Sequence, residues 1–416
     1  MMKGLPKTKR GYAILIACLV FVFGLTFGWR WAVVSWKIRE ARANLREMKI
    51  QEAVSVLEYA ETLQPQRAEV LFLLARAYRR AGELDRVSEY LKRAEDAGWP
   101  KEDIQAQRHL TYVQNGQFGP AERFLEKALR SGVDDDLAEE IYEAQAKGYL
   151  KTFRLGDAQL CLNYWIEWKP DRIKPRMWLA DIYERVDNWN AAIEQYRKIL
   201  ELDNTRAETH FRLAKSLLHI QKIKPAKEHF EKCLEYQPDN VSAQIQLAIC
   251  RRRLGLADDS GAELRKILNQ SLPAPERLEL LVELAQVEFR DLRRPQVAID
   301  LLKQAEKIAP THQPIHVTLS AAYHRLGKTK LAEKHQKLAT ESQARLDRLM
   351  KITRRLLQSP KDADLRYEVG KIYMEQGMKE AGANWMRTAL IFNPNHTQAK
   401  EALAKYEAER KSGLSR

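Results

Sequence analysis

Residues 176–203 read RMWLADIYERVDNWNAAIEQYRKILELD, and this stretch decides the fold. Apolar residues recur every three or four positions on both sides of a short polar segment, which predicts two amphipathic helices joined by a turn. Ala180 and Ala192 stand near the middle of these two helices. Antiparallel helices cross closely only where side chains are small, so the two alanines predict a tightly packed helical hairpin.

The same pattern recurs along most of the chain. Five of the nine intervals between successive units are 34 residues, and three others differ from this length by one to three residues. The unit resembles the tetratricopeptide repeat in its length and in its order of large, small and aromatic positions. This resemblance implies an all-α fold, a right-handed superhelical α-solenoid of helix-turn-helix repeats. The ten units begin at Val34, Ala68, Glu102, Glu139, Ile173, Ala207, Val241, Leu278, Gln313 and Ala363.

The repeat phase breaks at two places, residues 256–277 and residues 339–360, and the second break sets the expected domain boundaries. Residues 339–360 keep helical apolar spacing through Leu346, Leu349, Ile352 and Leu356, although they exceed one repeat. A charged helix at the end of the chain suits a solenoid, because it covers the last apolar face. We expect repeats 1–9 in residues 34–346, an extended helix and linker in 347–362, repeat 10 in 363–396, and a capping helix and tail in 397–416.

The sequence predicts a membrane anchor in the N-terminal region. A basic tail, residues 1–11, precedes an uncharged run at residues 12–29, which as a helix is about 27 Å long. Trp29, Trp31 and Trp36 suit a membrane surface. We expect a transmembrane helix at residues 12–33 in a bacterial inner membrane, with the repeats in the periplasm or, alternatively, in the cytoplasm. A cleaved signal peptide is disfavoured because no A-x-A site follows the run.

Composition and motifs argue against several function classes. The net charge of +14 suggests nucleic acid, but Lys and Arg alternate with Glu and Asp as on solvated helix faces, so nucleic acid is not expected as a partner. The four cysteines lack metal-ligand spacing, and Pro314 separates His312 from His316 with no acidic ligand close by. No phosphate-binding loop or catalytic motif is present. We therefore expect no enzymatic activity, no cofactor and no metal.

The resemblance implies that the first helix of each unit lines a groove that binds partner proteins. Many of the expected groove residues are cations, so we predict a basic groove for an acidic peptide or C-terminus, with arginine binding carboxylate. The alternative is that first helices end in basic residues for solubility and for interaction with the helix dipole. The expected partner-binding residues are Phe72, Arg76, Arg79, Arg80, Trp178, Arg185, Phe211, Arg212, Lys215, Arg252, Arg253, His324 and Arg325.

These features together predict a membrane-anchored scaffold or adaptor that binds proteins through its concave surface in cell-envelope assembly or secretion. The alternative is a structural subunit of a larger membrane enzyme complex. The chaperone-binding subtype of the repeat family is disfavoured, because Ala144, Trp178 and Arg212 stand where its clamp uses asparagine.

Overall fold

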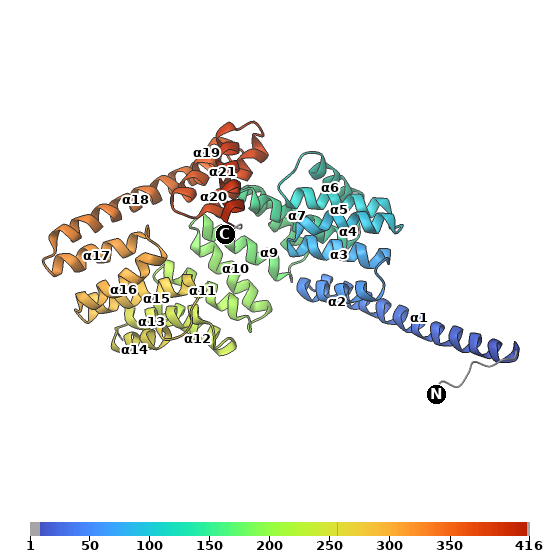
Figure 1. Cartoon of the computed structure of the whole chain (residues 1–416). Helices are drawn as coiled ribbons and strands as arrows, with labels where there is room; N and C mark the ends of the chain where they lie inside the picture. Colours follow the sequence, from blue (N-terminus) through green and yellow to red (C-terminus); the bar gives the residue numbers. More distant parts are fainter. Residues whose placement is uncertain (1–8, 256, 414–416) are drawn as a thin grey trace. The chain divides into compact units, whose positions relative to one another are not determined.

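The computed structural model describes the backbone of residues 9–255 and 257–413 and the side chains of residues 28–255 and 261–412. Over these residues the chain is all-helical and contains no strand (Figure 1). It divides into two compact units, Met1–Thr152 and Phe153–Arg416. We call them unit 1 and unit 2 and describe each by itself.

Unit 1 is a stack of helical hairpins. Neighbouring helices pack side by side, and α7 packs against α5. The core runs from Val34 through Leu57 and Leu74 to Ile104, all fully buried. The helices are α1 Lys9–Arg46, α2 Ile50–Leu63, α3 Ala68–Ala81, α4 Leu84–Asp96, α5 Lys101–Gln114, α6 Pro120–Ser131 and α7 Asp135–Lys151.

Unit 2 continues the same hairpin pattern and includes one long helix, α18, drawn in orange in Figure 1. The first half of α18 buries Ala332 and Ala339, and the second half buries Ile352 and Leu356, so a single helix contributes to two successive packing layers. The elements are α8 Leu155–Trp168, α9 Ile173–Arg185, α10 Trp189–Leu202, α11 Ala207–His219, α12 Ile223–Tyr236, α13 Val241–Arg253, α14 Ala257–Leu268, α15 Ala274–Gln286, a π-helical turn Val287–Asp291, α16 Pro295–Ile308, α17 Gln313–Arg325, α18 Thr329–Gln358, α19 Ala363–Glu375, α20 Lys379–Phe392 and α21 Thr397–Gly413.

A hydrogen bond recurs at the start of several first helices of unit 2. The fourth residue of the helix donates to the backbone carbonyl six positions earlier, in the turn that precedes the helix. This bond satisfies a carbonyl of the turn and fixes the path of the chain into the helix. The pairs are Arg176 with Pro170, His210 with Asn204, Gln244 with Pro238, His316 with Pro310 and Arg366 with Pro360.

The prediction of a transmembrane helix is wrong. The prediction of a single-pass membrane protein, with its repeats in the periplasm or in the cytoplasm, is wrong with it. No helix in the described part of the chain is both long and apolar enough to cross a bilayer. From Gly28 onward α1 carries Arg30, Lys37 and Glu40, and it buries Val34 within the core of unit 1, so this part of the helix belongs to the repeat stack. The side chains of residues 1–27, on which the prediction mainly depended, lie outside the described residues.

The last hairpin of unit 2 is packed most tightly at two glycines. A Cβ atom added to Gly382 would lie 2.7 Å from the backbone oxygen of Gly370 and 2.7 Å from Cγ of Met374. At the same crossing in other hairpins the residue pairs are alanines, such as fully buried Ala180 and Ala192. The helices α19 and α20 therefore leave no room for a methyl group at Gly382.

We predict that Gly382→Ala lowers the free energy of unfolding by about 1–3 kcal/mol, because the added methyl group overpacks the crossing. The matched control is Gly156→Ala in α8, where a Cβ atom meets nothing within 4 Å. That change should stabilise the chain by about 0.4–1 kcal/mol, because alanine restricts the unfolded chain. Urea unfolding of the full chain measures both, and equal stability of the Gly382→Ala variant and the parent would contradict the tight crossing.

Candidate functional site

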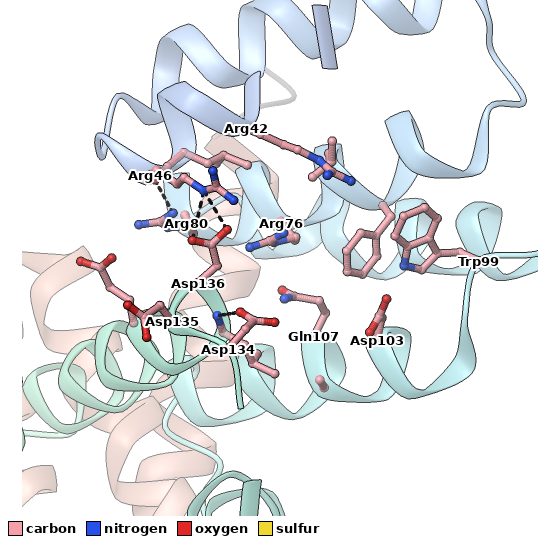
Figure 2. A pocket seen from close by; sticks show the side chains of 16 residues that line it. Arg42, Arg46, Arg76, Arg80, Trp99, Asp103, Gln107, Asp134, Asp135 and Asp136 are labelled. Carbon is pink, nitrogen blue, oxygen red and sulfur yellow. Dashed lines mark hydrogen bonds and ion pairs between the residues drawn. The ribbon is translucent and has the colours of Figure 1, made fainter. Parts of the chain in front are cut away.

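A cavity of about 520 Å³ opens in unit 1 between α1, α3, α5 and the start of α7. Figure 2 shows Trp99, Asp103 and Gln107 at one end of the cavity and Arg46, Arg80 and Asp136 at the other. First helices of successive hairpins supply most of the lining. The cavity is therefore the place in unit 1 where the stacking of repeats creates a concave surface.

One wall of the cavity is aromatic. The rings of Phe72 and Trp99 stack with centroids 4.7 Å apart and an interplanar angle of 19°. Phe72 belongs to α3, whereas Trp99 lies in the turn between α4 and α5, just before Pro100. Both side chains line the cavity, so the stack offers an apolar face to anything that enters.

The predicted arginines of α3 are held by carboxylates of α7. Arg76 and Arg79 each form an ion pair with Glu140, at 2.8 and 2.7 Å, and Arg80 pairs with Glu143 at 2.7 Å. Arg79 and both glutamates are almost completely buried. Buried charges are tolerated only when they are paired and hydrogen-bonded, so this network holds α7 against α3.

The network also changes the acidity of Glu140. Burial alone disfavours the charged carboxylate, but Arg76, Arg79 and Arg80 outweigh it and lower the pKa of Glu140 to about 2. Gln107 strengthens this effect because it donates a hydrogen bond of 2.8 Å to the same carboxylate. Glu140 is therefore ionised at neutral pH, and its charge is used inside the fold.

The remaining cations at the cavity are also paired. Arg42 contacts Glu69 at 2.7 Å, and Arg46 contacts Asp136 at 3.0 Å. Asp134 caps α7 by accepting a hydrogen bond from the backbone N–H of Leu137. By contrast, Asp103 is exposed and has no ion pair within the described chain. The cavity thus presents an available carboxylate rather than available arginines.

In unit 2, several predicted groove residues contact neighbouring helices. Arg212 of α11 pairs with Asp181 of α9, and Arg252 of α13 pairs with Glu283 at 3.4 Å. Arg325 of α17 lies over the ring of Phe289 in the π-helical turn. Other contacts stay within one helix, since Lys215 lies over Phe211 of α11 and Lys174 lies over Trp178 of α9. Arg185, Arg253 and His324 are exposed and form no ion pair among the described residues. Four of the thirteen predicted residues therefore lie in unit 1 and nine in unit 2.

Sequence reasoning missed the acidic half of the site. The run Asp134-Asp135-Asp136 and the pair Glu139-Glu140 stand at the start of α7. Asp136 pairs with Arg46 of α1 (Figure 2), and Glu140 pairs with Arg76 and Arg79 of α3. The available signal was the concentration of five carboxylates within residues 134–140. Trp99 and Asp103 carried no signal, because only the stacking of α3 and α5 places them beside Phe72.

Family comparisons support the repeat assignment. Residues 173–206 and 207–240 match one model described as a tetratricopeptide repeat, and residues 38–102 match a second model of the same description. The chain therefore contains tetratricopeptide repeats and folds as an all-helical repeat solenoid. Repeats of this kind typically serve as non-catalytic scaffolds for protein–protein interaction.

Individual relatives cover only parts of the chain. Human peptidyl-prolyl cis-trans isomerase FKBP4 is 32% identical over 83 residues, which is 20% of this chain and 18% of that protein. The rat mitochondrial import receptor subunit TOM34 is 29% identical over 99 residues, 23% of this chain and 32% of that protein. The alignments thus span less than a third of either relative.

Solved repeat proteins align at low identity. The structure of YrrB, a repeat protein with an unusual peptide-binding site, shares 17% identity at a TM-score of 0.29 and covers 58% of this chain and 96% of its own. Pseudomonas aeruginosa pilF shares 14% identity at a TM-score of 0.37 and covers 56% of this chain and 97% of its own.

We predict that Glu140→Gln destabilises unit 1 by about 3 kcal/mol at pH 7, because it leaves Arg79 buried without a full countercharge. The folded-state pKa of Glu140, about 2, lies below its ordinary value of 4.5. Its stabilisation is thus complete above about pH 4.5 and is lost as the pH falls towards 2, so the parent and the variant should converge over that range.

Hydrogen exchange of α3 and α7 at several pH values measures this difference. The control is Glu83→Gln, which removes an exposed ion pair with Arg86 at 3.2 Å and should change stability by less than about 1 kcal/mol. Equal exchange in the Glu140→Gln variant and the parent at pH 7 would show that the buried network does not hold α7.

Proposed function

We propose that this chain is a protein-binding scaffold and that the cavity of unit 1 takes up a segment of a partner protein. The observation that carries the proposal is the cavity of about 520 Å³ with the stacked Phe72 and Trp99 on its wall. Ligand pockets in proteins commonly enclose about 300–1,000 Å³ and combine apolar walls with a few polar groups. The volume suits a few side chains of a bound segment.

The chemistry of the lining favours an apolar and cationic occupant over an acidic one. Arg42, Arg46, Arg76 and Arg80 already have carboxylate partners, so an acidic peptide would have to displace them. Asp103 is exposed beside the aromatic wall without an ion pair among the described residues. We propose a segment that places an aliphatic or aromatic side chain on Phe72 and Trp99 and a Lys or Arg next to Asp103.

The surrounding fold supports this role by making the cavity rigid. The buried pairs between α3 and α7 fix two of its walls before any partner arrives, which lowers the entropic cost of binding. The predicted roles in cell-envelope assembly, in secretion or in a membrane enzyme complex all depended on a transmembrane anchor. They are therefore not part of the proposal.

We predict that peptides selected from a random display library on the purified full chain combine an apolar or aromatic residue with a nearby Lys or Arg. Trp99→Ala should weaken their binding about thirtyfold, because truncating a central tryptophan costs about 2 kcal/mol. Asp103→Asn should weaken binding severalfold and reduce its dependence on salt. Fluorescence anisotropy of labelled peptides gives the dissociation constants.

The matched control is Asp96→Asn, which removes an exposed carboxylate of α4 outside the cavity and should leave peptide affinity unchanged. Circular dichroism of each variant checks that the helices are retained. Selection of peptides rich in Asp and Glu, or affinity that does not respond to Trp99→Ala, would contradict the proposal and favour an acidic partner.

A further inference from the structure

Three side chains from consecutive helices of unit 2 converge on one point. They are Glu306 of α16, His316 of α17 and His335 of α18. The Nδ1 atoms of the two histidines are 3.1 Å apart, and Oε1 of Glu306 lies 3.8 Å from Nδ1 of His316 and 4.0 Å from Nδ1 of His335. Both imidazoles are buried, whereas Glu306 is partly exposed and borders solvent.

The hydrogen bonds of His316 fix which of its nitrogens is available. Its Nε2 lies 2.7 Å from the carbonyl oxygen of Pro310, and a carbonyl only accepts, so Nε2 carries the proton. The Nδ1 atom of His316 therefore presents a lone pair towards His335, whose Nδ1–H donates to it. Zinc binding replaces this hydrogen bond, and His335 then carries its proton on Nε2. A second-shell carbonyl that orients an imidazole in this way is typical of metal-binding histidines.

The cluster offers two imidazole nitrogens and one carboxylate oxygen, which are ligand atoms that zinc prefers. The distances between these atoms are close to those of a zinc site. Zinc bonds to His nitrogen and carboxylate oxygen at about 2.0–2.2 Å, so two donors of a tetrahedral ion lie about 3.3 Å apart. The two nitrogens at 3.1 Å meet this distance, and the carboxylate must move inward by about 0.5–0.7 Å relative to 3.8 and 4.0 Å. Glu306 is long and partly exposed, so a change of its rotamer supplies this movement.

The carboxylate of Glu306 gives the cluster a negative charge that offsets part of the charge of a bound zinc ion. Its Oε1 atom faces the Nδ1 atoms of both buried imidazoles, at 3.8 and 4.0 Å.

An earlier repeat contains the same histidine pair without the carboxylate. His210 and His229 also stand 19 residues apart with their Nδ1 atoms 3.0 Å apart, and Nε2 of His210 lies 2.9 Å from the carbonyl oxygen of Asn204. Glu306 precedes His316 by ten residues, and the residue ten before His210 is Leu200. The histidine pair is thus a repeated structural element, and only the later copy has a third ligand.

We propose that Glu306, His316 and His335 bind one zinc ion, with water in the fourth position, and that the ion ties α16, α17 and α18 together. This site reverses the expectation from sequence that the chain binds no metal. That expectation considered His312 with His316, whereas the partners of His316 lie on the helices before and after its own. The site lies in unit 2 and is argued independently of the cavity in unit 1.

The experiment uses the full chain without an affinity tag. Equilibrium dialysis against Zn²⁺, followed by metal analysis, should give one bound ion with a dissociation constant in the micromolar range or below. At a hundredfold excess over this constant the melting midpoint should rise by about 5 °C or more. Co²⁺ in place of Zn²⁺ should give the visible absorption of a tetrahedral nitrogen and oxygen site.

The zinc site can be tested with substitutions that copy residues from equivalent positions of other repeats. His316→Gln should abolish binding without unfolding, because Gln244 makes the equivalent hydrogen bond to Pro238 at 2.8 Å. Glu306→Leu reproduces the Leu200 arrangement and should also abolish binding, while the control His210→Gln should leave it intact. Leu200→Glu should raise the stoichiometry to two ions. Absence of zinc binding by the parent chain, or equal loss in the His210→Gln and His316→Gln variants, would overturn the proposal.

Discussion

The close crossing of paired helices is the constraint on which the rest of this structure depends. Two helices bury their apolar stripes only if their backbones approach, and the residues at the crossing decide whether they do. Ala180 and Ala192 allow this approach in one hairpin, and Gly370 and Gly382 allow a still closer one in the last. Once the crossing is fixed, every other position of the repeat acquires a defined neighbour on the next helix.

This fixed register determines where the charges go. First helices of different hairpins come close enough for an arginine on one to meet a carboxylate on another, as Arg212 of α11 meets Asp181 of α9 and Arg79 of α3 meets Glu140 of α7. Many arginines of the chain are therefore neutralised locally by carboxylates of other helices, while the net charge of +14 is unchanged. The cavity of unit 1 differs because it contains an exposed carboxylate that is not paired. Asp103 lies beside the aromatic wall and forms no ion pair in the described chain.

The helices and their small crossing residues could be predicted from the sequence because their signals are local. Helices begin at Ala68, Ile173, Ala207, Val241, Gln313 and Ala363, where the repeat pattern places the start of a unit. The cavity could not be predicted, because Phe72 and Trp99 meet only through the packing of successive hairpins. The membrane interpretation was wrong because no helix in the described part of the chain is both long and apolar enough to cross a bilayer. It depended on an apolar run whose side chains lie mainly outside the described residues.

Comparing equivalent positions of different repeats distinguishes contacts that the fold requires from contacts that it does not require. Positions 19 residues apart on the two helices of a hairpin face one another in two repeats, where His210 with His229 and His316 with His335 form the same contact. A contact that recurs is explained by the framework. The position ten residues before the first histidine differs, with Leu200 in one copy and Glu306 in the other, and there the framework imposes no choice. Glu306 differs from the residue at the equivalent position of the other repeat, and it adds a third candidate ligand to the histidine pair. Such a difference between repeats indicates chemistry that the fold alone does not require.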